Sequence, residues 1–145
     1  MNKHEELVKL LDMMRTHARL WASEWGKNNP LEISQSQATT LDILNSEGPM
    51  PSTYLSQIVG VTSGGMTVIS DKLVRQKLIR RVNDTNDRRI VKLEITEEGR
   101  EAMKQVRAKQ EALADKLFDP LEPEEIQFMA AIYRKLLDQP LRNNE

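Results

Sequence analysis

The apolar residues of this chain change their spacing partway along it, and this change limits the folds open to the chain. As far as residue 76 they recur at steps of three and four residues, the spacing of amphipathic helices. Residues 78–82 and 89–95 are rich in β-branched side chains and partly alternate, which predicts two strands. The polar residues 83–88 between them, rich in Asn and Asp, predict a turn. We therefore expect a hairpin with a charged tip.

Two helices are predicted at the start of the chain. The first covers residues 3–27, and one of its faces carries a regular apolar stripe: Leu7, Leu11, Met14, Ala18, Trp21 and Trp25. A stripe this regular needs a partner surface, either the far end of the chain or a second subunit. The second helix covers residues 37–45, with Ser34 or Ser36 as its N-cap.

Two short helices are predicted directly before the hairpin. One opens at Pro51 with Ser52 as its N-cap and ends at Gly60, and its buried side is expected to be Leu55, Ile58 and Val59. The next covers residues 63–76, with Met66, Ile69 and Leu73 on its inner face. After the hairpin, residues 97–118, capped by Thr96, and residues 124–138 predict two further helices.

Charge is concentrated in the middle of the chain. The whole chain carries a net charge of -1, but residues 50–93 hold eight Lys and Arg against three Asp. A basic segment within an almost neutral protein points to a localised anionic partner. The alternative is chance clustering on a solvated face.

Short helices followed by a hairpin form the winged helix-turn-helix layout. A helix fits the major groove of duplex DNA, and a hairpin reaches the adjacent minor groove. The outer face of the fourth helix offers small or hydroxyl residues that permit close approach: Thr62, Ser63, Gly64, Thr67, Val68 and Asp71. The pair Gly64-Gly65 is costly at a helix start, and close approach to another surface explains it. The alternative is that both glycines only shape the turn.

The predicted wing carries Asp87 beside Arg88 and Arg89. An aspartate next to an arginine can hold the guanidinium in one orientation. An extended arginine suits a narrow minor groove, where the negative potential is focused. The alternative is a surface salt bridge with no ligand, worth about 0–1 kcal/mol.

Residues 37–99 resemble the MarR family of transcription regulators. The resemblance rests on residues 62–67, 71–73 and 78–81, on Asp87-Arg88-Arg89, and on Ile95 to Gly99. It implies a mainly α (α+β) fold, a winged helix-turn-helix with helical dimerisation arms at both ends. The implied domains are residues 1–33 as the first arm, 34–99 as the DNA-binding lobe and 100–145 as the second arm.

The resemblance also implies a function and its residues. It implies a cytoplasmic homodimer that binds a pseudo-palindromic double-stranded DNA operator sequence-specifically, as a repressor relieved by a small-molecule effector. Asp87 would brace Arg89 for the minor groove, with Arg88 as the fallback. The other implied DNA contacts are Ser63, Gly64 and Thr67 in the major groove, and Ser36 and Gln37 at the DNA backbone. The chain departs from the family at Lys77, where a glycine usually ends the recognition helix, and at Val68-Ile69, where relatives often carry a basic residue.

A small aromatic or phenolic effector is a further implication of the resemblance. Arg15 and His17 would meet its carboxylate, while Trp21 and Trp25 would stack on its ring. The alternative, ordinary packing of two tryptophans at helical spacing, is the one that we favour.

Other functions fit the sequence less well. We expect no enzyme, metal or cofactor, because the only histidines, His4 and His17, match no metal motif and the chain has no cysteine. We expect no membrane contact, because no apolar run approaches the roughly 18 residues of a span. The start of the chain lacks a signal-peptide core, which favours a cytoplasmic location. The serious rival is a winged-helix module that binds protein without binding DNA.

Overall fold

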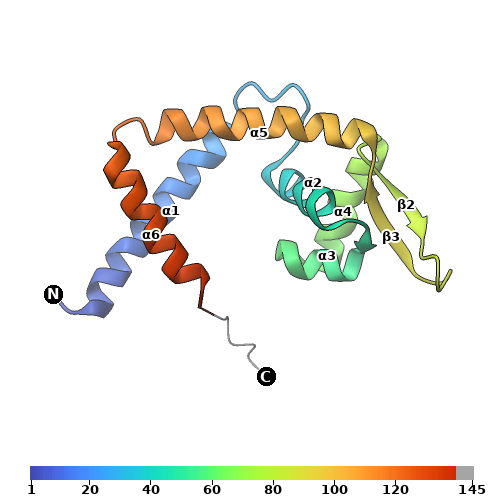
Figure 1. Ribbon diagram of the computed structural model, residues 1–145, viewed down its shortest axis with the longest axis horizontal. Helices are drawn as coiled ribbons and strands as arrows, with labels where there is room; N and C mark the ends of the chain where they lie inside the picture. Colours follow the sequence, from blue (N-terminus) through green and yellow to red (C-terminus); the bar gives the residue numbers. More distant parts are fainter. Residues whose placement is uncertain (140–145) are drawn as a thin grey trace.

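A computed structural model describes residues 1–139 and shows two helical bodies joined by one long helix. The helix α5 (Glu97–Leu117) spans the molecule in Figure 1. At one end lie α1 (Lys3–Gly26) and α6 (Pro123–Leu137). At the other lies a lobe made of α2 (Gln35–Glu47), β1 (Met50–Pro51), α3 (Ser52–Val59), α4 (Ser63–Arg75), β2 (Ile79–Asn83) and β3 (Val91–Ile95). This is the mainly helical winged helix-turn-helix that the sequence predicts.

Side-chain caps fix where most helices begin. Of the two candidates for α2, Ser34 is the N-cap, because its hydroxyl accepts from the Gln37 amide while the Gln37 side chain accepts from the Ser34 amide. Thr96 caps α5 as predicted and accepts a bond from the Gly99 amide at 3.0 Å. The helix α3 has the predicted extent and ends at Gly60, but its predicted N-cap was wrong, since Ser52 is its first helical residue and Pro51 stands at the cap.

The sheet is antiparallel, in the order β1-β3-β2. In the hairpin, Ile79 pairs with Ile95 and Asn83 with Val91. The predicted second strand was too long, because Arg89 and Ile90 lie in the turn, which the polar side chains at the tip organise. The two-residue β1 was not predicted, and its Met50 pairs with Leu93.

The helix α4 ends in a left-handed turn at Lys77, whose φ is +62°. The Lys77 amide donates to the Val74 carbonyl at 2.9 Å, and the Leu78 amide donates to the Leu73 carbonyl at 3.0 Å. These two bonds form a Schellman motif, and the buried Leu73 and Leu78 supply its apolar pair. A position that needs positive φ explains why a glycine is usual there, and Lys77 adopts the same turn at a conformational cost.

The core lies where α5 crosses the lobe. It is built of aliphatic residues and methionine: Leu41, Leu44, Leu55, Met66, Leu73, Ile79, Leu93, Ile95, Met103 and Val106. The prediction that Ile58 is buried was wrong, since it is 40% exposed and Ser56 lies inward instead. Gly99 packs so closely that an added Cβ would lie 2.1 Å from the Leu78 carbonyl oxygen. The root of the hairpin and the start of α5 therefore fit only without a side chain at residue 99.

The helix α5 runs through the point where the sequence divides the lobe from the second arm. Ala102, Met103 and Val106 lie beyond residue 100 and are buried in the lobe's core. Toward its other end, Lys116 of α5 binds Glu24 of α1 at 2.7 Å, and Lys27 binds the same carboxylate at 2.8 Å. These bonds lower the pKa of Glu24 from 4.5 to about 2. The last six residues of the expected second arm lie outside the described range.

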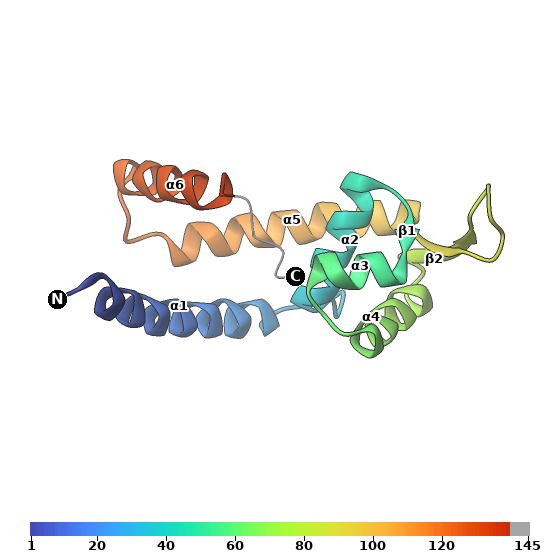
Figure 2. The same ribbon diagram turned by 90° about the horizontal axis from the view of Figure 1, so that it is seen from below.

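The helices α1 and α6 leave broad apolar faces open. Figure 2 shows them on opposite sides of α5, so neither covers the other. No residue of α6, which is described over its whole length, is buried. The exposed apolar side chains on the two helices are Leu7, Val8, Leu10, Leu11, Met13, Met14 and Leu20, and Ile126, Phe128, Ile132, Tyr133, Leu136 and Leu137. Within residues 1–139, no helix combines the length and the apolar character needed to span a membrane.

Candidate nucleic-acid interface

The helix α4 lies along one edge of the lobe, and the hairpin projects beyond it (Figure 2). Ser63, Gly64 and Thr67 are exposed on its outer side, whereas Met66 and Leu73 on the other side are buried. An added Cβ at Gly64 would meet no atom within 4 Å. The side of α4 that the sequence assigns to DNA is thus open, and glycine at residue 64 keeps its backbone accessible.

The first threonines of α4 use their hydroxyl groups within the helix. The Thr62 hydroxyl oxygen accepts from the Gly65 amide at 3.0 Å and caps the helix. The Thr67 hydroxyl donates to the Ser63 carbonyl at 3.0 Å. Each threonine therefore has its hydroxyl occupied in a local bond, and its methyl group remains as a second contact group.

The tip of the hairpin is held by its own side chains. The Asp84 carboxylate accepts from the Asn86 amide at 3.1 Å, from the Asp87 amide at 2.9 Å and from the Lys92 ammonium at 2.8 Å. The Lys92 ammonium and the two amides lower the pKa of Asp84. The Asn83 amide group donates to the Arg88 carbonyl at 2.7 Å. The turn is therefore fixed before any ligand arrives.

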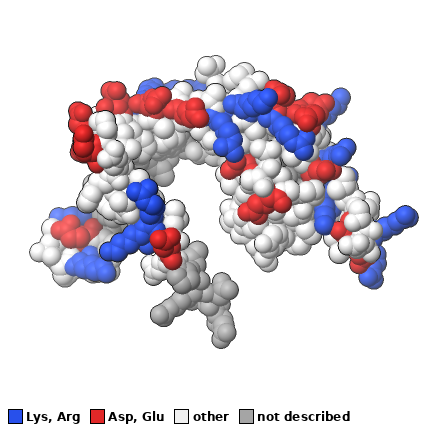
Figure 3. Space-filling view, viewed as in Figure 1, with Lys and Arg blue, Asp and Glu red and all other residues white. Residues whose placement is uncertain are grey.

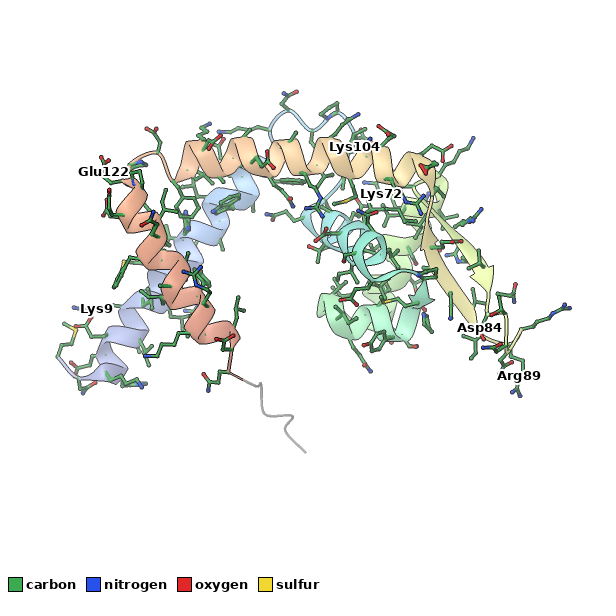
Figure 4. The ribbon with its side chains drawn as sticks, in the orientation of Figure 1. Lys9, Lys72, Asp84, Arg89, Lys104 and Glu122 are labelled. Atoms are coloured by element: carbon green, nitrogen blue, oxygen red, sulfur yellow. The ribbon has the colours of Figure 1, made fainter. Side chains whose placement is uncertain are left out.

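Asp87 and Arg89 form a forked ion pair at this tip. The Arg89 Nε lies 3.0 Å from Asp87 Oδ1, and Nη2 lies 3.0 Å from Oδ2. The Arg89 bonds lower the pKa of Asp87, and the same side-chain bond raises the pKa of Arg89. The Arg89 side chain is nevertheless 90% exposed. Figure 4 shows it at the tip, directed away from the body of the protein.

The other arginines of the hairpin differ in how they are held. Arg88 is exposed at the tip, and its carbonyl is the acceptor for Asn83. Arg80 binds Glu94 across the hairpin, and Arg81 binds Asp71 of α4. Figure 3 shows the far end of the hairpin, at the right of the view, as a group of blue Lys and Arg side chains. The projecting end of the lobe is therefore positively charged.

Two further residues of α4 are exposed on the side of the helix that the sequence assigns to DNA. Val68 was noted there only as part of the outer face, yet its side chain is 71% exposed beside Thr67. Arg75 is exposed two turns further on. Helical spacing from Gly64 places both residues on the same face, and this signal was available in the sequence.

The start of α2 offers less than the sequence predicts. Ser36 is exposed in its first turn. Gln37 is only 3% exposed, and its side-chain oxygen accepts from the Ser34 amide at 2.8 Å. Since this oxygen is the second half of the capping box, Gln37 serves the helix start and has almost no surface to offer to a phosphate.

The four residues predicted to line an effector pocket do not meet in one cavity. Arg15 is exposed on α1 beside Asp12. His17 packs edge-on against the Trp21 ring, with 6.2 Å between the centres of the two rings. Trp25 is buried, and its indole N–H donates to the Ile33 carbonyl at 2.8 Å. The four residues lie on one helix, as the sequence predicts. In the structure, however, Arg15 is exposed, His17 packs against Trp21, and Trp25 is buried apart from them.

Trp25 lines a different cavity, of about 310 Å³, between the end of α1, the following loop and α5. Its walls are largely apolar and include Pro30, Leu31 and Val106. The Lys109 ammonium lies 4.5 Å from the centre of the Trp25 ring and donates to the Trp25 carbonyl at 2.5 Å. The cavity thus combines apolar walls, an aromatic ring and one positive charge.

These features define a class of protein. A short helix positions a second one with an open outer face, and a hairpin beside it carries an exposed, braced arginine. This is the arrangement of the winged helix-turn-helix DNA-binding proteins, which present a helix to the major groove and a wing to the neighbouring one.

The chain belongs to the MarR family of transcription regulators. The family model matches residues 33–91. The HTH-type transcriptional regulator YpoP of Bacillus subtilis is 30% identical over 105 residues, which cover 72% of this chain and 74% of YpoP. The HTH-type transcriptional repressor MdtR of the same organism is 28% identical over 104 residues, which cover 72% of this chain and 67% of MdtR.

Solved structures share the fold over most of the chain. A mutant of MarR from E. coli, complexed with operator DNA, superimposes with a TM-score of 0.77 at 20% identity, covering 94% of this chain and 99% of that one. The transcriptional regulator PcaV from Streptomyces coelicolor, in complex with its natural ligand, gives a TM-score of 0.72 at 20% identity, covering 87% and 89%. At this level of identity the likeness concerns the fold.

Proposed function

We propose that two copies of this chain form a homodimer that binds a pseudo-palindromic double-stranded DNA site sequence-specifically and represses transcription, and that a small aromatic or phenolic acid releases it. The relative MdtR is named a repressor, and a MarR of the same fold is complexed with operator DNA. The observation that carries the proposal is the exposed Arg89 guanidinium, braced by Asp87 on a hairpin beside the open face of α4.

The brace explains how the wing would act on DNA. An arginine that enters a minor groove must hold an extended side chain, which costs conformational entropy. Asp87 already holds the Arg89 fork through two side-chain bonds, so part of that cost is met before binding. The negative potential of a narrow minor groove then attracts the exposed guanidinium. Ser36, Ser63, Gly64 and Thr67 would contact the DNA from the lobe, with Arg88 as a second wing contact.

The open faces of α1 and α6 support the homodimer. Exposed apolar patches of this extent mark interaction sites on soluble proteins. Phe128 is 69% exposed in the middle of α6, and Leu11 and Met14 are exposed along α1. In this proposal residues 1–33 and the chain beyond residue 100 form the arms, with the first turns of α5 shared between arm and lobe. A two-fold pair would present two α4 helices about one turn of DNA apart, roughly 34–36 Å.

The cavity at Trp25 supports an effector site, and it replaces the four-residue pocket predicted on α1. An aromatic acid would place its ring beside Trp25 and Pro30 and its carboxylate near Lys109. A regulator of this fold, PcaV, has been crystallised with its natural ligand. In a Trp21→Phe background, only Trp25 fluorescence remains to report binding. A panel of hydroxybenzoates that changes neither this signal nor DNA affinity would refute the site.

The wing tests the proposal directly. A binding site is first selected from random duplex DNA, and affinity for it is measured by gel shift. Arg89→Ala is expected to lose about 1.5–3 kcal/mol of binding free energy, the range of a hydrogen bond to a charged group. That loss is about 10–100-fold in affinity for each Arg89 that contacts DNA, and the two copies in the proposed dimer multiply it. Lys104→Ala, on the side of α5 away from the hairpin tip in Figure 4, is the control that keeps full affinity.

Salt dependence separates DNA binding from a protein-binding module. Each neutralised phosphate contributes about -0.9 to the slope of log affinity against log salt concentration. A steep slope in the wild type is expected. If no duplex is selected, DNA binding is excluded and the protein-binding alternative stands. If Arg89→Ala binds the selected duplex as tightly as Lys104→Ala, the wing is excluded from the mechanism of DNA binding.

A further inference from the structure

The first part of the outer face of α4, before Arg75, presents apolar groups. A helix that reads bases commonly presents arginine or lysine side chains there. Residues 62–71 contain no Lys or Arg. Val68 is 71% exposed and lies next to Thr67 on the open side of the helix. A valine this exposed gains nothing from the core, so its side chain is available to a partner.

Some of the polar side chains near Val68 form bonds within the lobe. The exposed Thr67 donates its hydroxyl hydrogen to the Ser63 carbonyl, so it offers a methyl group without a free donor beside it. The Thr62 hydroxyl oxygen caps the helix. One turn beyond Val68, Asp71 is paired with Arg81 of β2. Thr67 and Val68 therefore offer methyl groups and no free hydrogen-bond donor, whereas the exposed Ser63 at the start of α4 keeps its hydroxyl.

Space in front of Val68 permits direct contact with bases. Gly64, one turn earlier on the same face, has no atom within 4 Å of where its Cβ would be. The backbone of α4 can thus lie against the floor of the groove, which brings the Val68 methyls within van der Waals reach of base edges. In the major groove, thymine is the natural base that presents a methyl group, at C5.

We propose that Val68, with the Thr67 methyl, is a specificity-determining residue that selects thymine at one position of each half-site through methyl–methyl contact. This inference rests on the proposed DNA-binding function. The selectivity comes from apolar area removed from water when the two methyl surfaces meet. Losing one buried methyl corresponds to about a fourfold loss of affinity. A two-fold symmetric site loses this factor in each half.

Uracil in place of thymine isolates the methyl group, because uracil keeps the same hydrogen-bonding pattern. Each thymine of the selected site is replaced by uracil in turn, in both half-sites together, and affinity is measured for the wild type. At the contacted position we expect a loss of about 16-fold, fourfold per half-site. At thymines away from α4 we expect less than a twofold change.

Val68→Ala is then tested on the same duplexes. It should bind the thymine site more weakly than the wild type and discriminate less against uracil at the contacted position, since only the Thr67 methyl of the proposed pair remains. Ile58→Ala removes exposed apolar surface from α3 and should keep the full discrimination. Uniform tolerance of uracil by the wild type, or equal discrimination by Val68→Ala, overturns the inference while leaving DNA binding in place. If no duplex is bound at all, the proposed function itself fails.

Discussion

The left-handed turn at Lys77 predicts that replacing this residue with glycine stabilises the lobe. A residue with a Cβ in this region costs about 1–2 kcal/mol. Glycine adopts it freely but loses about 0.5–1 kcal/mol more conformational entropy on folding. From the difference between these two costs, Lys77→Gly should raise the free energy of unfolding by about 0.5–1 kcal/mol. Both Schellman bonds and the Thr96 bond to the Lys77 carbonyl use backbone atoms that glycine retains.

Thermal unfolding at one fixed protein concentration measures the effect, with an expected rise in melting temperature of about 1–4 °C. Lys77→Ala is the matched control, because it removes the charged side chain but keeps the strained φ, and it should leave stability unchanged. Gly60→Ala reverses the experiment: Gly60 has φ +81° and free space for a Cβ, so the variant should lose a similar amount. Equal gains from Lys77→Gly and Lys77→Ala would show that the side chain, and not the turn, is responsible.

Three further predictions concern packing, pH and assembly. Gly99→Ala should destabilise the protein by about 1–3 kcal/mol in denaturant unfolding, because its Cβ meets the Leu78 carbonyl; an unchanged midpoint would contradict the packing. The folded pKa of Glu24 is about 2, below its ordinary 4.5, so the stability it contributes is present above pH 4.5 and is lost as the pH falls toward 2. Thermal melts from pH 6 to 3 should therefore show a smaller drop for Glu24→Gln than for the wild type, and equal drops would refute the Lys116 and Lys27 bonds. Phe128→Glu should shift sedimentation at micromolar concentration from dimer to monomer, whereas a persistent dimer would remove α6 from the interface.

Local signals in the sequence were enough to predict most of the elements. Thr96 before two glutamates, and apolar residues at helical steps, gave the start of α5 and its inner side. The strand β1 was out of reach, because two residues show no period and its partner, Leu93, lies more than forty residues along the chain. Helical spacing alone did not fix how α3 is rotated about its axis. The sequence therefore predicted Ile58 inside the lobe, where the structure has Ser56.

The site residues likewise fall into two groups: those that short-range geometry predicts and those that depend on contacts between distant parts of the chain. Asp87 and Arg89 are two residues apart, so their fork follows from short-range geometry, and the structure has it as the sequence predicts. The pocket residues were chosen from one helix face, but a cavity needs walls from several elements. Lys109 reaches Trp25 from α5, a contact over 84 residues that no spacing rule reveals. Gln37 was assigned to DNA by resemblance, while its capping role draws it inward.

The helix α4 is hydrogen-bonded to the loop that follows α1. The Lys72 ammonium donates to the Glu32 carbonyl at 2.9 Å, and the Gln76 side chain donates to the Leu31 carbonyl at 3.0 Å. Leu31 is also part of the cavity wall beside Trp25. A shift of this loop that keeps both bonds would carry α4 with it and move Leu31. Under the proposed function, the orientation of α4 on DNA and the shape of the cavity would then change together. If both sites bind as proposed and are coupled through this loop, the effector changes the affinity for DNA by the same factor as DNA changes the affinity for the effector.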